Sequence, residues 1–332
     1  ATVSVFIMIF ASFPIIVSSE EHVTEERESI YEKYPVMTDI PPLTEEDFSM
    51  PEYDPDPQPL SSPDELPSQF SWTNYGGDWT TPARDQGNCG SCWDFSALGA
   101  MEAAINIASG SPDTDIDLSE QYVLSCLSYA GSCSGGWMHL ALQCIASTEP
   151  GPRGNGVNGC TIESCMPYQA RDDIPCEDKC EDWDYVELSK DGKLWQIESW
   201  GWSTFDEDDP SDWEVIKSWI YNIGPLAVDI YASPSFISFW STHHSPNDVY
   251  QQDDPGVTNH GVVVVGWVDD PDILNGGYWI CKNSWGTSWG YNGFFNIAYG
   301  CNSFATRNCC WVKTYKWPRP VGPGPAPRRM QV

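Results

Sequence analysis

The chain has 332 residues, with 48 acidic and 16 basic side chains, a formal net charge of −32 and a hydrophobic fraction of 41%. That hydrophobic fraction is enough for a sizeable core and excludes wholesale disorder. The negative charge argues against nucleic acid or an anionic membrane surface as the main partner, because both are negatively charged themselves.

The apolar start of the chain predicts a targeting segment. Residues 1–17 are almost wholly apolar and uncharged, and the small Ser19 suits a cleavage site. We expect residues 1–19 to be a secretory signal peptide that is truncated, because its positively charged start is missing. A membrane anchor is the alternative, at the short limit for spanning and interrupted by Pro14. A membrane is therefore expected as a partner only if this segment is retained.

Residues 20–66 have a different composition, with 15 acidic and 2 basic residues and many prolines. Such a segment buries little apolar surface and folds poorly by itself. It predicts an acidic, Pro-rich propeptide or linker. At the other end, residues 317–332 form a Pro/Gly-rich tail.

Two helices are predicted in the first half of the globular region, residues 67–316. Trp93–Ala108 has apolar residues at helical spacing and ends before Gly110, a helix stop signal. Leu118–Cys126 is a second helix with Ser119 as its N-cap.

Short apolar runs rich in β-branched residues follow in the second half and predict strands. They cover Leu226–Ile230, Gly261–Val268, Tyr278–Lys282 and Gly293–Ile297. Helices in the N-terminal half and strands in the C-terminal half predict an α+β arrangement of two subdomains.

The cysteines point to a free thiol in an oxidising compartment. Thirteen cysteines are more than a reducing cytosol usually tolerates without metal. Disulfides use sulfurs in pairs, so the odd count leaves at least one thiol free unless a partner chain takes it. A free thiol in a secreted chain is a liability unless it does chemistry.

Cys92 is the candidate for that thiol. It stands in the stretch QGNCGSCW at the first turn of the predicted helix, where the helix N-terminus favours the thiolate. A thiolate attacks carbonyl carbon. The alternative, a Cys89–Cys92 disulfide of the redox type, is disfavoured because a polar, Pro-containing segment precedes the motif where a strand would be needed.

A nucleophilic cysteine needs a base, and the chain has five histidines. His22 lies in the expected propeptide, and His243 and His244 lie in a polar stretch typical of a solvated loop. His139 has the character of a structural histidine. His260 immediately precedes the apolar strand, so a rigid element can hold its ring toward a cleft.

Asn283 is the candidate for the group that orients this base. It follows a predicted strand in the sequence KNSWG, and its side-chain oxygen can accept a hydrogen bond from an imidazole N–H and fix the tautomer. Trp285, two residues later, can cover that hydrogen bond. Alone, Asn283 would be an ordinary turn residue.

Five sequence blocks resemble the papain family of cysteine peptidases, in the order that this family has them. They are QGNCGSCW at 86–93, SEQYVLSC at 119–126, CSGGW at 133–137, NHGVVVVGW at 259–267 and YWICKNSWGTSWGYNGFF at 278–295. The resemblance covers residues 67–312. It implies an α+β fold with a mostly helical N-terminal lobe, a β-barrel-like C-terminal lobe and an active-site cleft between them.

The resemblance also implies a role for each matched residue. Cys92 is the nucleophile, His260 forms an ion pair with it and later protonates the leaving amine, and Asn283 orients His260 under the cover of Trp285. Gln86, through its side-chain amide, and the backbone N–H of Cys92 form the oxyanion hole, and an acyl-enzyme thioester is the intermediate.

Substrate-binding residues are implied in the same way. Gly135 and Gly136, with Trp137 next to them, resemble the residues whose backbone pairs with a bound peptide as an extra strand. Trp289 resembles an aromatic wall on the leaving-group side. Asp229 falls near the pocket for the second residue before the cut, so we expect this pocket to accept basic residues alongside hydrophobic ones. The alternative is that Asp229 points to solvent.

Two further features concern charge and sulfur. Asp94 stands two residues after the nucleophile, where the family usually has a small apolar residue, and we expect it to pair with a polar group or face water.

Family spacing suggests the disulfides Cys89–Cys133 and Cys126–Cys176. Without Cys92 an even twelve cysteines remain, and those that cannot be paired from sequence are Cys144, Cys160, Cys165, Cys180, Cys281, Cys301, Cys309 and Cys310.

The expected function is that of a cysteine endopeptidase made as a zymogen, which acts on polypeptide substrates and has its own propeptide as a candidate inhibitor. We expect it to be secreted or to reside in a lysosome- or vacuole-like compartment. No cofactor and no nucleic-acid partner are expected. No metal is expected either, because the acidic runs at 172–184 and 206–212 are more typical of solvated surface than of Ca²⁺ sites. The alternatives are a catalytically inactive peptidase-like binding protein and a transpeptidase or ligase that uses the same thioester.

Overall fold

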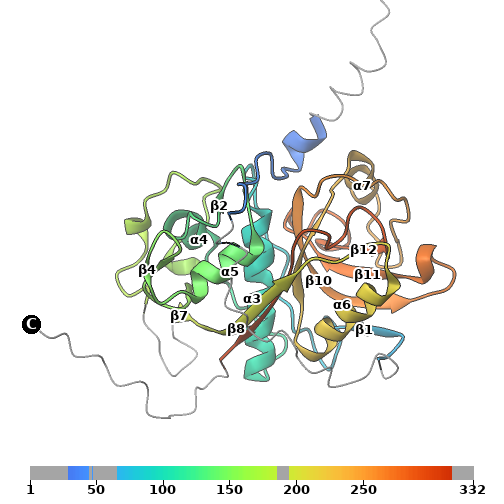
Figure 1. Ribbon diagram of the computed structural model, residues 1–332, viewed down its shortest axis with the longest axis horizontal. Helices are drawn as coiled ribbons and strands as arrows, with labels where there is room; N and C mark the ends of the chain where they lie inside the picture. Colours follow the sequence, from blue (N-terminus) through green and yellow to red (C-terminus); the bar gives the residue numbers. More distant parts are fainter. Residues whose placement is uncertain (1–28, 45–46, 48–65, 185–193, 316–332) are drawn as a thin grey trace, which may run out of the picture.

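The computed structural model describes residues 29–44, 47, 66–184 and 194–315. They form two halves on either side of a central helix, α3 (Cys92–Ser109), and the segment 29–44 lies over the junction between the halves at the top of Figure 1. The expectations for residues 1–19, for most of 20–66 and for 317–332 lie outside the described residues.

Helix α3 is buried along almost its whole length, because both halves pack against it. Small residues on successive turns, such as Ala97, Ala100 and Ala104, allow this close approach. The helix ends at Gly110, which has a φ of 66°, a left-handed conformation that suits glycine. The helix predicted over Trp93–Ala108 is confirmed.

The first half contains α4 (Glu120–Cys126) and α5 (Met138–Ala146), linked by short two-residue strands. Ser119 caps α4 and accepts a hydrogen bond from the backbone N–H of Tyr122, so this prediction is confirmed. Helix α5 was not predicted. The remaining short elements are β2 (Gly131–Ser132), β3 (Gly135–Gly136), β4 (Pro150–Gly151), β5 (Gly154–Asn155), β6 (Cys160–Thr161), η2 (Glu163–Cys165), η3 (Cys176–Asp178) and β7 (Leu194–Trp195).

The second half is built on one antiparallel sheet with the order β12-β11-β10-β9-β13-β8, and β1 pairs with β10. The four predicted strands are confirmed to within one residue at each end. The described strands leave this path open and do not close a barrel. The strands are β1 (Gln69–Ser71), β8 (Ile197–Ser203), β9 (Leu226–Ile230), β10 (His260–Asp269), β11 (Gly277–Lys282), β12 (Phe294–Ala298) and β13 (Cys309–Thr314).

Helices also occur in the second half, which corrects the prediction that they cluster in the first. They are α6 (Pro210–Asn222), α7 (Pro234–Trp240) and the short η4 (Leu274–Gly276). Asp209 is the N-cap of α6 and accepts a hydrogen bond from the backbone N–H of Ser211, and Ser233 is the N-cap of α7. A proline follows each of these caps at the first helical position. These local signals start helices inside a strand-rich half. Among the described helices, none is both long and apolar enough to cross a bilayer.

Three disulfides stabilise the first half: Cys89–Cys133, Cys126–Cys176 and Cys165–Cys180. The first two are the pairs that the resemblance implied. Of the twelve cysteines other than Cys92, six form these disulfides, and the other six are unpaired and buried. A buried cysteine packs as a small apolar residue and needs no partner. These six are Cys144, Cys160, Cys281, Cys301, Cys309 and Cys310.

Candidate active site

Cys92 opens helix α3 and carries a free, fully buried thiol. Burial raises its pKa to about 12, while nearby backbone N–H groups, including those of Gly261 and Met37, act in the opposite direction. The sulfur is therefore protonated in this form of the chain. The alternative Cys89–Cys92 bridge is wrong, since Cys89 is bonded to Cys133.

His260 is the first residue of strand β10, and its ring contacts the side chains of Asn283 and Trp285. Its Nε2 is 2.7 Å from Oδ1 of Asn283, and its ring stacks on Trp285 with centroids 4.3 Å apart. Its Nδ1 has no hydrogen-bond partner among the described residues. Burial lowers the pKa of His260 to about 4, so the ring is neutral here.

The backbone at Gly261 brings the start of β10 against the start of α3. A Cβ at this position would lie 2.9 Å from the carbonyl oxygen of Cys92 and 2.8 Å from Oγ of Ser96, so only glycine permits the contact. The thiol-bearing and imidazole-bearing residues, 168 positions apart in sequence, thus come from backbone segments in direct contact.

Gln86 is held from both sides. Its Nε2 donates to the carbonyl of Cys89 at 2.8 Å, and its Oε1 accepts from Oγ of Ser284 at 2.7 Å. Ser284 follows Asn283 directly and fixes the Gln86 amide with its N–H₂ group turned toward the cleft. Sequence reasoning missed Ser284, although its position next to the orienting asparagine was a usable signal.

A segment of the same chain occupies the cleft. The carbonyl of Pro35 accepts from Nε2 of Gln86 at 3.1 Å and from Nε1 of Trp285 at 3.2 Å. The N–H of Met37 donates to the carbonyl of Asn259 at 2.8 Å. The segment therefore lies against the backbone next to His260, and the Met37 backbone also acts on the Cys92 thiol.

The segment continues along the glycine-rich strand of the first half. The backbone N–H groups of Thr38 and Asp39 both donate to the carbonyl of Ser134, at 2.7 and 2.9 Å, next to Gly135 and Gly136. Farther along, Nε1 of Trp137 donates to the carbonyl of Pro41 at 2.7 Å. The three predicted peptide-binding residues of β3 and its flank therefore line the groove that the segment fills.

The far end of the segment is anchored by a buried ion pair. Asp47 is 2% exposed, lies 2.7 Å from Nη1 of Arg153 and accepts a hydrogen bond from the hydroxyl of Tyr129 at 2.9 Å. Burial opposes the charge on Asp47, but its hydrogen bonds and Arg153 outweigh burial and lower its pKa. Neither Arg153 nor Tyr129 was singled out from sequence.

Trp289 lies one layer behind the cleft. It is 2% exposed and meets Trp285 edge-on, with ring centroids 5.0 Å apart, and packs against Phe236 and Phe295. In this form it supports Trp285 and has almost no open surface, so its role as an aromatic wall on the leaving-group side stays a prediction.

Asp229 is not an open acidic wall, and it does not point to solvent. It is 1% exposed, and its Oδ1 accepts from the backbone N–H groups of Arg307 and Asn308 at 3.3 and 3.1 Å. Burial raises its pKa to about 6, while a hydrogen bond from the Thr258 side chain counts among the opposing effects. Its carboxylate is used to hold two loops, so the alternative that Asp229 points to solvent is wrong, while the acceptance of basic residues stays a prediction.

Asp94 also departs from its expectation. It is fully buried, and neither carboxylate oxygen has a hydrogen-bond partner among the described residues. Burial raises its pKa well above the ordinary value, and the neighbouring carboxyl of Glu120 adds to the shift. The expected solvent-facing side of α3 does not exist, because the helix is covered on all sides.

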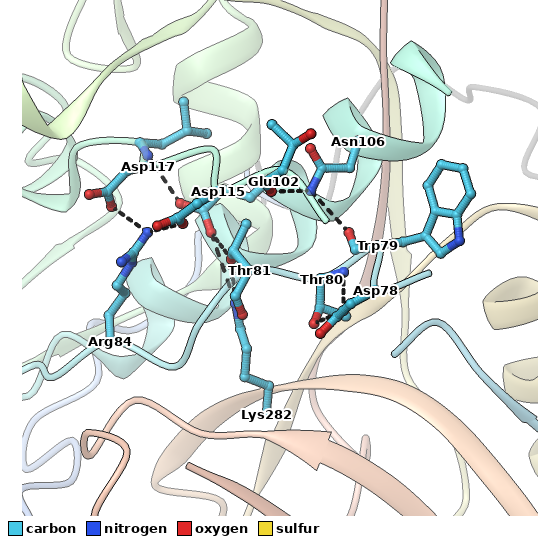
Figure 2. A network of polar contacts seen from close by, with 12 residues as sticks. Asp78, Trp79, Thr80, Thr81, Arg84, Glu102, Asn106, Asp115, Asp117 and Lys282 are labelled. Atoms are coloured by element: carbon cyan, nitrogen blue, oxygen red, sulfur yellow. Dashed lines mark hydrogen bonds and ion pairs between the residues drawn. The ribbon is translucent and has the colours of Figure 1, made fainter. Parts of the chain in front are cut away.

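A polar network joins α3 to Lys282, the last residue of β11 (Figure 2). Nζ of Lys282 donates to Oγ1 of Thr81 at 2.8 Å and lies 3.9 Å from a carboxylate oxygen of Glu102. Glu102 also accepts hydrogen bonds from Thr81 and from the backbone N–H of Leu118. This network fixes residue 282, and with it Asn283, relative to the helix that begins at Cys92.

The remaining described histidines have structural contacts. His139 is buried, stacks on Trp202 with centroids 4.3 Å apart and lies 2.7 Å from the Asn308 amide. His243 stacks on Phe239, and Nδ1 of His244 lies 2.7 Å from the carbonyl of Gly290, so the two rings do not form a metal pair. Within the described ranges, no group of three or more His, Cys, Asp or Glu side chains could hold a metal ion.

Comparison with known proteins agrees with this geometry. Residues 66–316 match the model of the papain family cysteine proteases. The chain is 32% identical over 242 residues to a cathepsin L-like peptidase of Aedes aegypti, covering 70% of this chain and 59% of that protein. It is 31% identical over 244 residues to procathepsin L of Rattus norvegicus, covering 72% and 62% respectively. The chain thus spans about three fifths of the length of these relatives.

Solved proform structures have the same fold. The digestive procathepsin L2 proteinase from Tenebrio molitor larval midgut superposes with a TM-score of 0.57 at 25% identity, over 90% of this chain and 82% of that one. The Amb a 11 cysteine protease, a ragweed pollen allergen solved in its proform, has a TM-score of 0.57 at 23% identity, over 75% and 67%.

Proposed function

The chain belongs to the papain family of cysteine proteases, and on this premise we propose that it is an endopeptidase whose own residues 29–44 keep it in an inhibited precursor form. The observation that carries the proposal is the hydrogen bond between Nε2 of His260 and Asn283, beside an unpaired Cys92 at the start of α3. This bond leaves Nδ1 of His260 as the nitrogen that can exchange a proton with the sulfur.

Catalysis begins when the cleft is emptied. The Cys92 thiol gives its proton to Nδ1 of His260, and the thiolate attacks the peptide carbonyl carbon. The amide of Gln86 and the backbone N–H of Cys92 stabilise the oxyanion, each by about 3 kcal/mol. The C–N bond breaks as His260 returns the proton to the leaving amine. Water then attacks the thioester, His260 accepts its proton, and the acid product and the thiol are released.

The direction of the cleft segment supports inhibition rather than turnover. By family resemblance, the acyl side of a substrate lies along Gly135 and Gly136, and the leaving group lies toward Trp285. The segment runs the opposite way, since Pro35 lies at Gln86 and Trp285 while Asp39 lies at Ser134. Its peptide bonds are therefore reversed in the groove, and it excludes substrate without being cut at that site.

The site of action follows from the sulfur chemistry. Three disulfides are typical of a protein that matures in an oxidising compartment, which supports a secreted or lysosome- or vacuole-like location. Polypeptides are the proposed substrates.

An epoxide inhibitor of cysteine proteases tests the proposal. The full chain is treated before and after limited proteolysis has removed the cleft segment, and mass spectrometry locates the label. We expect labelling at Cys92 only after removal, none in Cys92→Ala, and cleavage of internally quenched peptides whose two ends are blocked. Absence of both labelling and cleavage would favour the inactive binding protein.

The same assay separates hydrolysis from ligation. With an added amine at millimolar concentration, a transpeptidase or ligase would release mainly the amide product. A hydrolase releases mainly the free acid, which is the expected result.

A further inference from the structure

Arg307 places a guanidinium group against Trp137, beside the groove. Its guanidinium carbon lies 4.7 Å from the centroid of the Trp137 ring. No hydrogen bond or ion pair to the guanidinium occurs among the described residues, although the side chain is only half-exposed. A guanidinium stacked on an indole keeps its N–H groups free at its edge, in a geometry that suits a carboxylate.

The position of Trp137 places this cation on the acyl side of the cleft. Trp137 directly follows Gly135 and Gly136, and its Nε1 holds the carbonyl of Pro41 in the segment that fills the groove. Pro41 is four residues beyond Met37, whose N–H is bound next to His260 at Asn259. A peptide that replaces the segment will therefore pass Trp137 within a few residues of the scissile bond.

Asp229 fixes Arg307 in this place. Its Oδ1 accepts the backbone N–H groups of Arg307 and Asn308, and its carbonyl accepts the N–H of Ala305. It also bonds the side chain of Thr258, the neighbour of Asn259, which contacts the bound segment. The carboxylate thus ties the Arg307 loop to the substrate-binding loop. The charge of Arg307 is one of the effects that lower the pKa of Asp229, although burial outweighs them, and no ion pair with the guanidinium forms within the described residues.

We propose that Arg307 is a specificity-determining residue that selects an acidic side chain on the acyl side of the scissile bond, where the bound peptide passes Trp137. The inference rests on the proposed function, since it concerns the substrate of that same site. It reverses the charge preference that Asp229 suggested from sequence. A glutamate carboxylate can accept two parallel hydrogen bonds from the guanidinium of Arg307. Glutamine has the same shape, but it carries no charge and has only one acceptor oxygen.

Matched fluorogenic peptides test this inference on the enzyme after removal of its cleft segment. The peptides differ only by Glu, Gln, Leu or Arg, placed in turn two, three and four residues before the cut. Active enzyme is counted by titration of Cys92 with the epoxide inhibitor. The variants are Arg307→Gln, which removes the charge, Arg307→Glu, which reverses it, and Lys313→Gln, which removes an exposed cation on β13 as a control.

We expect wild type to prefer Glu over Gln by about tenfold in kcat/KM at one of these positions, as a charge-assisted bond allows. Arg307→Gln should abolish that ratio while changing the rate on the Leu peptide by less than about threefold. Arg307→Glu should favour the Arg peptide, and Lys313→Gln should match wild type. An enzyme that cleaves the peptides with a Glu-to-Gln ratio independent of residue 307 overturns the inference alone. A protein that neither cleaves nor takes the epoxide overturns the proposed function and the inference with it.

Discussion

Nε2 of His260 lies 2.7 Å from Oδ1 of Asn283, and the same oxygen accepts the backbone N–H of Ser284 at 2.8 Å. The backbone N–H of Ser284 therefore fixes the position of the Asn283 oxygen that contacts the His260 ring. This geometry fixes one tautomer of His260, with the proton on Nε2, and leaves Nδ1 free to exchange a proton.

Replacing Asn283 by alanine removes this constraint. We expect kcat/KM for peptide cleavage to fall by about tenfold to a hundredfold, which is roughly 1.4 to 2.8 kcal/mol, because the ring can then rotate or carry its proton on the wrong nitrogen. Steady-state rates normalised to titrated Cys92 measure the effect. Asn247→Ala, at an exposed position, is the control. A loss of less than twofold would contradict the orienting role.

The cleft segment should control the reactivity of Cys92. Burial raises the thiol pKa to about 12 and lowers the His260 pKa to about 4, so both groups are neutral at pH 7 while the segment is bound. Each unit by which the thiol pKa falls raises the thiolate fraction about tenfold. We expect iodoacetamide to alkylate Cys92 at least about a hundredfold faster after the segment is removed. Equal rates for the two forms would show that the segment does not cover the sulfur.

Local sequence signals predicted much of the fold and the site. The helix at Cys92 and its end at Gly110 follow from apolar spacing and a left-handed glycine, and strand β10 follows from its β-branched run. The position of His260 before its strand made it the candidate base, whereas Asn283 alone looked like a turn residue and was assigned through the ordered sequence blocks around it. These features depend on a few neighbouring residues, so one sequence is enough to predict them.

Features that depend on which surfaces are covered could not be predicted. Asp94 was expected to pair with a polar group or face water, but both halves of the molecule pack on α3, and the carboxylate is buried without a hydrogen-bond partner among the described residues. Asp229 was assigned by spacing to a pocket wall, yet the loop at Arg307 folds back onto it and takes its oxygen. The short helix α5 has too few residues for a clear period. The errors at Asp94 and Asp229 thus concern long-range contacts that local spacing does not encode.

Removing the Asp94 carboxyl should stabilise the fold near neutral pH. Burial and the Glu120 carboxyl raise its pKa in the folded state. Both states hold the proton below the ordinary pKa, and as pH rises the unfolded state releases it first, so the folded state loses stability. At pH 7 we expect Asp94→Ala to raise the free energy of unfolding by about 1–3 kcal/mol, the cost of a buried unpartnered polar group.

Thermal unfolding at pH 4, 5.5 and 7 in a Cys92→Ala background measures this effect without self-digestion. A gain of this size raises Tm by about 2–4 °C per kcal/mol, and its pH-dependent part should vanish toward pH 4. Asp208→Ala, at an exposed acid, should change little. If Asp94→Ala is less stable than its background at pH 7, the carboxyl has a partner that the contacts do not include.

The ion pair between Lys282, at the end of β11, and Glu102, on α3, should affect both stability and activity. Lys282→Met leaves Glu102 buried without its nearest cation, and we expect this to destabilise the fold by about 3–5 kcal/mol. The variant should also lower kcat/KM, because Lys282 directly precedes Asn283. Lys313→Met, on an exposed strand position, is the control and should be near neutral.

A double-mutant cycle isolates the pair from general damage to the core. Glu102→Gln alone leaves Lys282 buried beside a neutral amide, while Lys282→Met with Glu102→Gln leaves no uncompensated charge. Because the two side chains share Thr81 as a partner, we expect the double variant to be more stable than the sum of the single losses by about 1–3 kcal/mol. Denaturant unfolding of all four proteins, again with Cys92→Ala, gives this coupling. Additive losses would mean that Thr81 and Leu118 satisfy Glu102 without the lysine, and that the link between α3 and Asn283 runs through packing alone.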